Sequence, residues 1–184
     1  PHAVDITHRR LALFRRLKQT RICAHAALQH ESGARLDVFN THLSLPQFLS
    51  WRALHFTASM GHAANQLLEL FNVLDFVAST HASEHFVLLG DFNSQPGSPV
   101  YQQVLDSGLF VDPLAQTLDL DDAAYRALPS AGFMHLAMHL DYVFSSPRLR
   151  WQDFDETAAH GIAHRFAGLS DHSPIIGRVA VPLA

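Results

Sequence analysis

The sequence contains little of what several common protein classes require. Its single cysteine, Cys23, excludes an internal disulfide framework and a cysteine-rich zinc module. No apolar run approaches the roughly 18–20 residues that a membrane-spanning helix needs. Charged residues make up only 16% of the chain, whereas about 25% is usual. There is also no internal repeat, low-complexity tract or long linker, so residues 1–184 are expected to form a single domain.

Apolar residues and histidines are plentiful instead. The 48% of hydrophobic residues is enough for a packed core, and 14 histidines supply part of the polar surface. The formal net charge of −4 disfavours nonspecific electrostatic binding to long DNA. Nothing in the sequence indicates a compartment or an oligomeric state.

The apolar pattern predicts strands that alternate with two helices. Residues 21–29 and 34–43 are expected to form a β-hairpin, and residues 86–89 a strand buried on both faces and closed by Gly90. Ser59 is expected to cap a helix that continues through residue 77, and Ser98 with Pro99 starts a second helix ending near Gly108. Further strands are expected at 140–144, 150–158 and 174–181, and the basic segment 1–18 is expected to be a solvated loop. The pattern indicates a layered α/β domain.

Polar side chains stand where these strands begin or end. Two groups follow strands, Asn40-Thr41-His42 and Asp91 with Asn93, and two precede strands, Asp141 and Asp171-His172. If the two kinds of strand run antiparallel, all four groups meet at one edge of the sheet. Each group taken alone is more typical of a turn, so the inference depends on their joint occurrence.

Such a cluster would combine three carboxylates, two imidazoles and one amide. Carboxylate oxygens bind hard divalent cations, and the imidazoles can transfer protons or stabilise charge. This combination favours hydrolysis of phosphoesters, in which a cation offsets phosphoryl charge and a carboxylate activates water.

Four stretches of the chain resemble, in order, the motifs of the endonuclease/exonuclease/phosphatase superfamily, which has the deoxyribonuclease-I-like fold. They are residues 40–43 (Asn-Thr-His-Leu), 90–94 (Gly-Asp-Phe-Asn-Ser), 140–143 (Leu-Asp-Tyr-Val) and 170–174 (Ser-Asp-His-Ser-Pro). The resemblance implies a four-layer α-β-β-α sandwich that cleaves phosphodiesters or phosphomonoesters. It also implies a magnesium cofactor, with manganese or calcium as alternatives.

The resemblance also implies roles for single residues. Asp91 would activate the attacking water, Asn93 would help to hold that water and the phosphate, and Asp171 would bind the metal. His172 would stabilise the charge of the phosphoryl oxygen and Asp141 would orient His172. His42 would contact the phosphate or assist the leaving group.

The start of the chain departs from the family pattern. The family has an N-terminal strand that carries an Asn and, further on, a Glu that is the principal metal ligand, and nothing before residue 20 resembles either. Glu31 lies in the expected hairpin turn and does not fit that Glu. Because the sequence begins at Pro1, we expect a domain incomplete at its N-terminus that alone binds magnesium poorly and turns over slowly.

Several competing interpretations stay open at this stage. The chain could be a non-catalytic remnant of the fold that binds a phosphorylated partner. His81 and His85 match the H-x-x-E-H pattern of inverted zinc peptidases, although the motif falls where a helix should end. The pair His135 and His139 is expected at the surface, and the aromatic stretch 48–60 either covers the core or forms a flap over the site. The resemblance implies a phosphate-ester substrate and leaves open whether it is nucleic acid, a phospholipid head group or a small phosphodiester.

Overall fold

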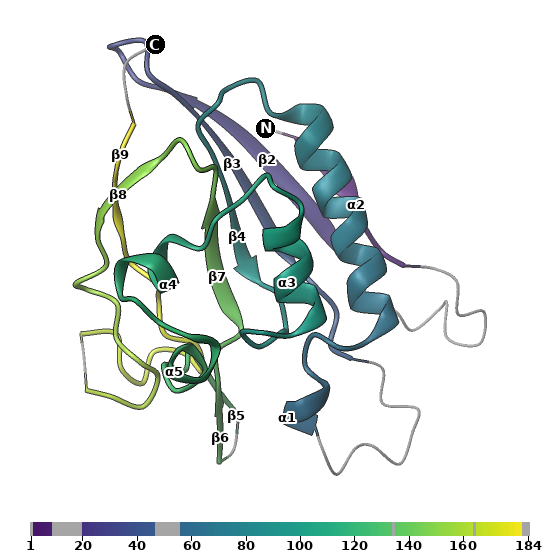
Figure 1. Ribbon diagram of the computed structural model, residues 1–184, viewed down its shortest axis with the longest axis vertical. Coiled ribbons are helices and arrows are strands. Elements are labelled where there is room, and N and C mark those ends of the chain that lie inside the picture. The colour runs from purple at the N-terminus through teal and green to yellow at the C-terminus, as the bar shows by residue number, and fades with distance from the viewer. Residues whose placement is uncertain (1, 9–19, 47–55, 134, 164, 182–184) are drawn as a thin grey trace.

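The computed structural model describes residues 2–8, 20–46, 56–133, 135–163 and 165–181. Its centre is a five-stranded sheet with the strand order β1-β2-β3-β4-β7 (Figure 1). The strands are β1 (His2–Asp5), β2 (Ile22–Gln29), β3 (Arg35–His42), β4 (Phe86–Asp91) and β7 (Asp141–Ser145). Strand β4 runs parallel to β3 and antiparallel to β7. The last residues of β3 and β4 and the first residues of β7 therefore lie at the same end of the sheet.

Two helices cover one face of this sheet, α2 (Ala64–Thr80) and α3 (Pro99–Asp106) (Figure 1). Phe39, Leu88 and Phe144 are neighbours in register on β3, β4 and β7, and each is 0% exposed. They belong to one hydrophobic core with the inward residues of the helices, which are Leu70, Val73, Leu74, Val77, Val100 and Val104. Burial of this apolar surface is the main term that holds helices and sheet together.

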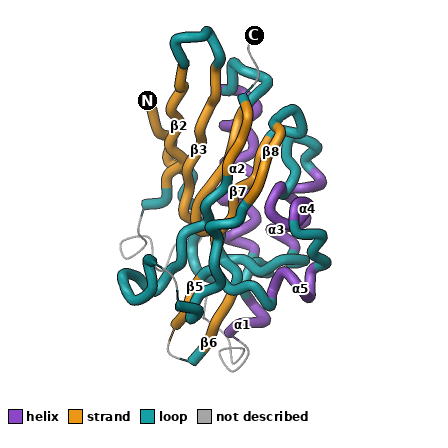
Figure 2. Tube along the Cα trace, turned by 90° about the vertical axis from the view of Figure 1, so that its left-hand side faces the viewer, coloured by secondary structure: helices purple, strands orange, loops and turns teal. Residues whose placement is uncertain are grey.

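The remaining elements are short and lie mostly near the β7 side of the sheet (Figures 1 and 2). Strands β8 (Arg150–Asp153) and β9 (Arg178–Ala180) pair with each other, as do β5 (Ala131–Phe133) and β6 (Leu136–Met138). The other helices are α1 (Phe56–Ser59), α4 (Pro113–Thr117) and α5 (Asp122–Arg126). No helix in the described part of the chain is long and apolar enough to cross a membrane.

The expected α/β class, the 21–43 hairpin and the strands predicted at 86–89 and 140–144 are confirmed, the two strands as β4 and β7. So is the second helix start, where the Ser98 hydroxyl accepts a hydrogen bond from the Tyr101 N–H at 3.4 Å and Pro99 is the first helical residue. Both residues suit these positions, because the cap satisfies a free N–H and proline has none to satisfy.

The start of the long helix was predicted wrongly. Ser59 belongs to the short helix α1, and α2 begins only after Ala63. Between the two helices Gly61 has a φ of 83°, which interrupts the helical path. The side chain of Gln66 caps α2 instead, accepting hydrogen bonds from the N–H groups of Gly61 at 3.1 Å and Ala63 at 3.4 Å.

The expected loop and strand lengths at the two ends of the chain also need correction. Part of the predicted loop 1–18 is strand β1, which pairs antiparallel with β2; residues 9–19 lie outside the described residues. The strand expected at 150–158 ends at Asp153, and the final strand covers only Arg178–Ala180. Residues 173–177 therefore separate His172 from β9.

Candidate active site

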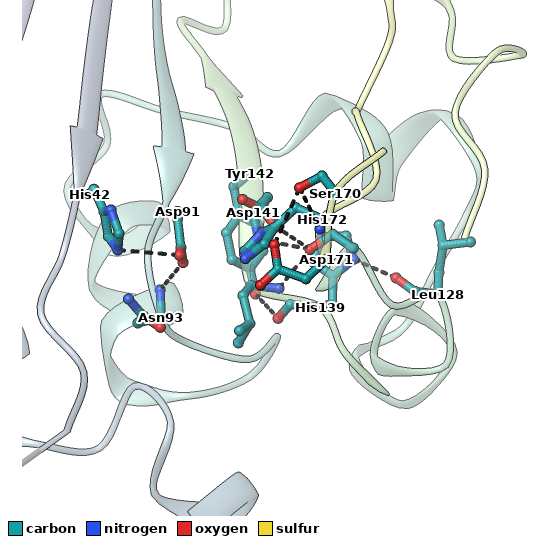
Figure 3. Close-up of polar contacts among 12 residues, drawn as sticks. His42, Asp91, Asn93, Leu128, His139, Asp141, Tyr142, Ser170, Asp171 and His172 are labelled. Atoms are coloured by element: carbon teal, nitrogen blue, oxygen red, sulfur yellow. Dashed lines mark hydrogen bonds and ion pairs between the residues drawn. The ribbon is translucent and has the colours of Figure 1, made fainter. Parts of the chain in front are cut away.

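The register of the central sheet places three polar side chains in one row. His42 on β3 is the register partner of Asp91 on β4, and Asp91 is in turn the partner of Asp141 on β7. All three lie at the end of the sheet where β3 and β4 finish and β7 begins (Figure 3). The predicted convergence of strand exits and a strand entry is confirmed for these residues.

Gly90 allows β4 to approach β3 closely beside this row. It has a φ of 137°, and a Cβ built on it would lie 1.8 Å from the carbonyl oxygen of Thr41. Any other residue would push the two strands apart at the position next to Asp91 and His42. The glycine of the Gly-Asp-Phe-Asn stretch is thus required by the backbone.

His172 joins the row from outside the sheet. Its Nδ1 lies 2.8 Å from Oδ2 of Asp141, and its side chain is 35% exposed. Oxygens or nitrogens of Asp91, Asp141 and His172 all lie within 4.8 Å of one another. These three side chains form the group that we call the acid–imidazole cluster.

The cluster perturbs the protonation of its own members. Burial, followed by the charge of Asp141, raises the pKa of Asp91 to about 6. The hydrogen bond to Asp141 raises the pKa of His172 to about 9. Near neutral pH the cluster therefore pairs a carboxylate poised to accept a proton with an imidazolium cation.

His42 stands at the exposed side of the row. Its Nε2 lies 3.4 Å from Oδ2 of Asp91, and its side chain is 56% exposed. Partial burial of the ring and the nearby positive charge of Arg21 lower the pKa of His42. The two site histidines consequently differ in charge at neutral pH, His42 being neutral and His172 cationic.

Asn93 lies next to Asp91, below it in Figure 3. Its N–H donates to Oδ1 of Asp91 at 2.8 Å, and its side-chain amide donates to the carbonyl of Leu43 at 2.8 Å. Its φ of 47° is in the left-handed region, which asparagine tolerates better than most residues. The structure thus gives Asn93 a role in holding the turn that orients Asp91; its predicted contact with water or phosphate stays a prediction.

Asp171 is at the rim, beside His172 (Figure 3). Its Oδ1 accepts a hydrogen bond from the Ser170 hydroxyl at 3.3 Å, and its carbonyl accepts one from the Gly132 N–H at 2.8 Å. Its carboxylate is not part of the acid–imidazole cluster, which contains Asp91 and Asp141 as its acids. The assignment of Asp171 as the metal ligand therefore stays a prediction, and the Asp141 carboxylate inside the cluster is a further candidate ligand.

Sequence reasoning missed Ser130, which the structure places against Asp141. The Ser130 hydroxyl donates to Oδ2 of Asp141 at 2.7 Å. Residues 112–132 have no clear apolar period, so nothing in the sequence connected this serine with the site.

Two alternative sites are also clarified. His81 follows the end of α2 and stacks on Phe86, and His85 directly precedes β4, so the two histidines do not share a helical face.

The expectation that His139 is at the surface is wrong. The residue is 1% exposed, its Nδ1 lies 2.6 Å from the carbonyl of Leu128, and burial lowers its pKa to about 4. Most of the aromatic stretch 48–60 lies outside the described residues, whereas Met60 is buried.

The face of the sheet opposite the helices carries a pocket beside the cluster. The pocket has a volume of about 560 Å³. Asp141 and His172 form one side of it, and Asn40, Leu89 and Val143 form its floor on the sheet. A ligand group bound at the cluster would have space on this side.

Comparisons with known proteins concern the fold and the family of the chain. A comparison with curated proteins gives no match. Among solved structures, the catalytic domain of human Nocturnin, with a bound sulfate anion, superposes with a TM-score of 0.60 at 19% identity, covering 99% of this chain and 59% of that one. An endonuclease/exonuclease/phosphatase from Bacteroides vulgatus gives a TM-score of 0.63 at 13% identity, covering 98% and 64%. A mannosyl-6-phosphatase from Bacteroides thetaiotaomicron gives 0.58 at 16% identity, covering 89% and 58%.

These structures share the fold, and this chain spans only 58–64% of their length. The sequence profile of the endonuclease/exonuclease/phosphatase family matches residues 9–172, most of the chain. That range contains the whole acid–imidazole cluster. The chain belongs to the endonuclease/exonuclease/phosphatase family.

Proposed function

We propose that the protein is a divalent-metal-dependent phosphoesterase in which water attacks phosphorus directly. The observation that carries the proposal is the pairing, within 4.8 Å, of a carboxyl whose pKa is about 6 with an imidazole whose pKa is about 9. A base with a pKa just below neutral pH can activate water, and a cation beside it can stabilise the charge that develops on the phosphoryl oxygens.

Asp91 is the base in this proposal. At neutral pH it is ionised and able to take the proton of the attacking water, while the N–H of Asn93 at 2.8 Å holds its other oxygen in place. His172 faces the phosphoryl oxygens as a cation, which stabilises the negative charge that develops there. Asp141 fixes the imidazole by accepting from Nδ1 at 2.8 Å, so Nε2 is the atom left for the substrate.

The residues present fit a hard divalent cation such as Mg²⁺. This ion usually takes only one or two carboxylates, together with water and substrate phosphate. In the cluster Asp141 supplies one carboxylate, beside Asp91, which is kept as the base. Asp171 is a third acid at the rim. When bound, the ion would offset the charge of the phosphoryl group. His172 is held by Asp141 as a cation and is kept for the phosphoryl oxygens in this proposal.

The neutral His42, 3.4 Å from Asp91, is placed to contact the phosphate or assist the leaving group.

The proposed substrate class is a phosphate ester with a group small enough to lie beside the cluster: a small phosphodiester or phosphomonoester, a phospholipid head group or a short nucleic acid. Two of the similar structures are named as phosphatases, a mannosyl-6-phosphatase and a 2',3'-cyclic phosphatase. The net charge of −4 disfavours long DNA.

The test is hydrolysis of a chromogenic phosphodiester and phosphomonoester by the protein in its full natural length, with Mg²⁺ and with a chelator. We expect metal-dependent turnover that falls about 10²–10⁴-fold in Asp91→Ala and in His172→Ala. Asp75→Ala and His30→Ala are the matched controls, since both residues are exposed and lie toward the opposite end of the fold, in the C-terminal half of α2 and in the turn between β2 and β3.

Two results would contradict the proposal. Phosphate binding without turnover would indicate the non-catalytic remnant, and unchanged activity in both site variants would place the chemistry elsewhere. For residues 1–184 alone we propose weak magnesium binding and slow turnover. The same assays are therefore run in parallel on residues 1–184.

A further inference from the structure

Ser130 is a buried serine just before β5, 4% exposed, in the segment that joins α5 to the site. It lies beside both functional chain segments, the start of β7 with Asp141 and the loop with His172. Every polar atom of Ser130 is used, and each contact is made to one of these segments or to β6.

The hydroxyl of Ser130 has no freedom in its orientation. Its oxygen accepts hydrogen bonds from the N–H groups of Leu140 at 2.9 Å and Asp141 at 3.0 Å. A hydroxyl has two acceptor lone pairs and one proton, so both lone pairs are occupied. The proton must therefore point to Oδ2 of Asp141, 2.7 Å away.

That same carboxylate oxygen holds His172. Oδ2 of Asp141 receives the Ser130 hydroxyl at 2.7 Å and lies 2.8 Å from Nδ1 of His172. The three groups form a chain of hydrogen bonds that runs from Ser130 Oγ through Asp141 Oδ2 to His172 Nδ1. An oxygen fixed by a hydrogen bond to a rigid donor fixes in turn the ring that it holds.

The backbone of residues 130–132 ties down the loop that carries the imidazole. The carbonyl of Ser130 accepts from the Ser173 N–H at 2.7 Å, and its N–H donates to the carbonyl of Met138 at 2.9 Å. Ala131 forms an antiparallel bridge with His172. The position of the loop and the direction of the ring are thus set from one short segment.

We propose that Ser130 is a positioning residue of the site, which aligns Asp141 and so keeps Nδ1 of His172 bound and Nε2 turned toward the substrate. The catalytic consequence rests on the proposed phosphoesterase function. The structural part, an ordered hydrogen bond between Asp141 and His172 that depends on the Ser130 hydroxyl, does not.

The test compares Ser130→Ala, which removes the hydroxyl, with Ser130→Thr, which keeps it. Ser145→Ala is the matched control, because Ser145 is also a buried, hydrogen-bonded serine, at the far end of β7 from Asp141. Long-range proton–nitrogen NMR spectra report the Nδ1–H of His172, with His172→Gln identifying the signal. Steady-state kinetics on the full-length protein give kcat and KM separately.

We expect the Nδ1–H signal in the wild type, Ser130→Thr and Ser145→Ala, and its loss or broadening in Ser130→Ala. Activity should fall about 10–100-fold in Ser130→Ala, in kcat with little change in KM, and be restored within about 3-fold by threonine. Ser130→Cys, similar in size and a weaker donor, replaces alanine if Ser130→Ala does not fold, and should give an intermediate loss.

An unchanged Nδ1–H signal in folded Ser130→Ala, or its absence from the wild type, would overturn the positioning role whatever the activity. Loss of the signal in Ser130→Ala, together with inactivity of every form including the wild type, would uphold the positioning role and overturn the proposed function.

Discussion

Charge at the candidate site is set by single contacts between residues. Burial, followed by the charge of Asp141, raises the pKa of Asp91 to about 6. The hydrogen bond to Asp141 raises the pKa of His172 to about 9. One carboxylate thus raises the pKa of both the proposed base, Asp91, and the proposed charge-stabilising imidazole, His172. Removing the charge of Asp141 should therefore change the pH dependence of activity at both its acidic and its alkaline limb.

The two pKa values predict a bell-shaped dependence of kcat/KM on pH. Activity should rise as pH increases through about 6, where Asp91 loses its proton and becomes a base, and fall above about 9, where His172 loses its proton and its positive charge. In Asp141→Asn the negative charge that raises both pKa values is gone, so both limbs should move to lower pH. Asp153→Asn, at the end of β8, should leave both limbs in place. A falling limb that stays at about 9 in Asp141→Asn would contradict the role of Asp141.

How much of the site could be predicted depends on which residues carry a local signal. His42 and Asp91 stand where apolar runs end and Asp141 stands where one begins, so antiparallel pairing of the two kinds of strand is enough to bring them to one end of the sheet. Ser130 and His139 carry no such signal. Their burial follows from how residues 128–141 fold back on the sheet, which no local pattern encodes.

At the level of the elements, the site depends on the close pairing of β3 and β4. Gly90 is the contact point, with its φ of 137° and its backbone against Thr41. The hairpin and the buried strand β4 were predictable because their runs of strand-forming residues are uninterrupted and bounded by turn residues. The start of α2 was not, because Gln66 caps it from inside the helix, whereas the sequence offered Ser59 as a conventional cap.

We predict that Gly90→Ala destabilises the protein by more than about 2 kcal/mol, because the new Cβ would collide with the Thr41 carbonyl and force a strained φ. Gly33→Ala is the control: its φ is 90°, but no atom lies within 4 Å of the added Cβ. That variant should lose only about 1 kcal/mol. Urea unfolding followed by circular dichroism measures both. Equal losses in the two variants would show that the contact with β3 is unimportant.

For the whole molecule, one core joins the sheet to the helices, and Cys23 lies within it. Cys23 is 0% exposed, and burial raises the pKa of its thiol to about 12. Since the thiolate is the reactive form, the only cysteine of the chain reports directly on opening of the core.

We expect Cys23 to resist iodoacetamide in the native protein at mildly alkaline pH and to react fully in urea, at the denaturant concentration where the fold is lost. Ile22→Cys provides the comparison, because the neighbouring position is 48% exposed and should be alkylated without denaturant. Mass spectrometry with digestion locates the modified residue. Rapid alkylation of Cys23 in the native state would contradict the packing of β2 against the helices.

The most direct test of the account is to map where a divalent cation binds. Mn²⁺ broadens the NMR signals of nearby nuclei, so a titration into the isotope-labelled protein identifies the binding site without any assay of activity. We predict that the backbone signals of Asp91, Asp141 and His172 broaden first, and that Asp91→Asn weakens the effect. Broadening that begins instead at the acidic segment 119–122, or equally across the surface, would show that these side chains do not form a metal-binding phosphoesterase site.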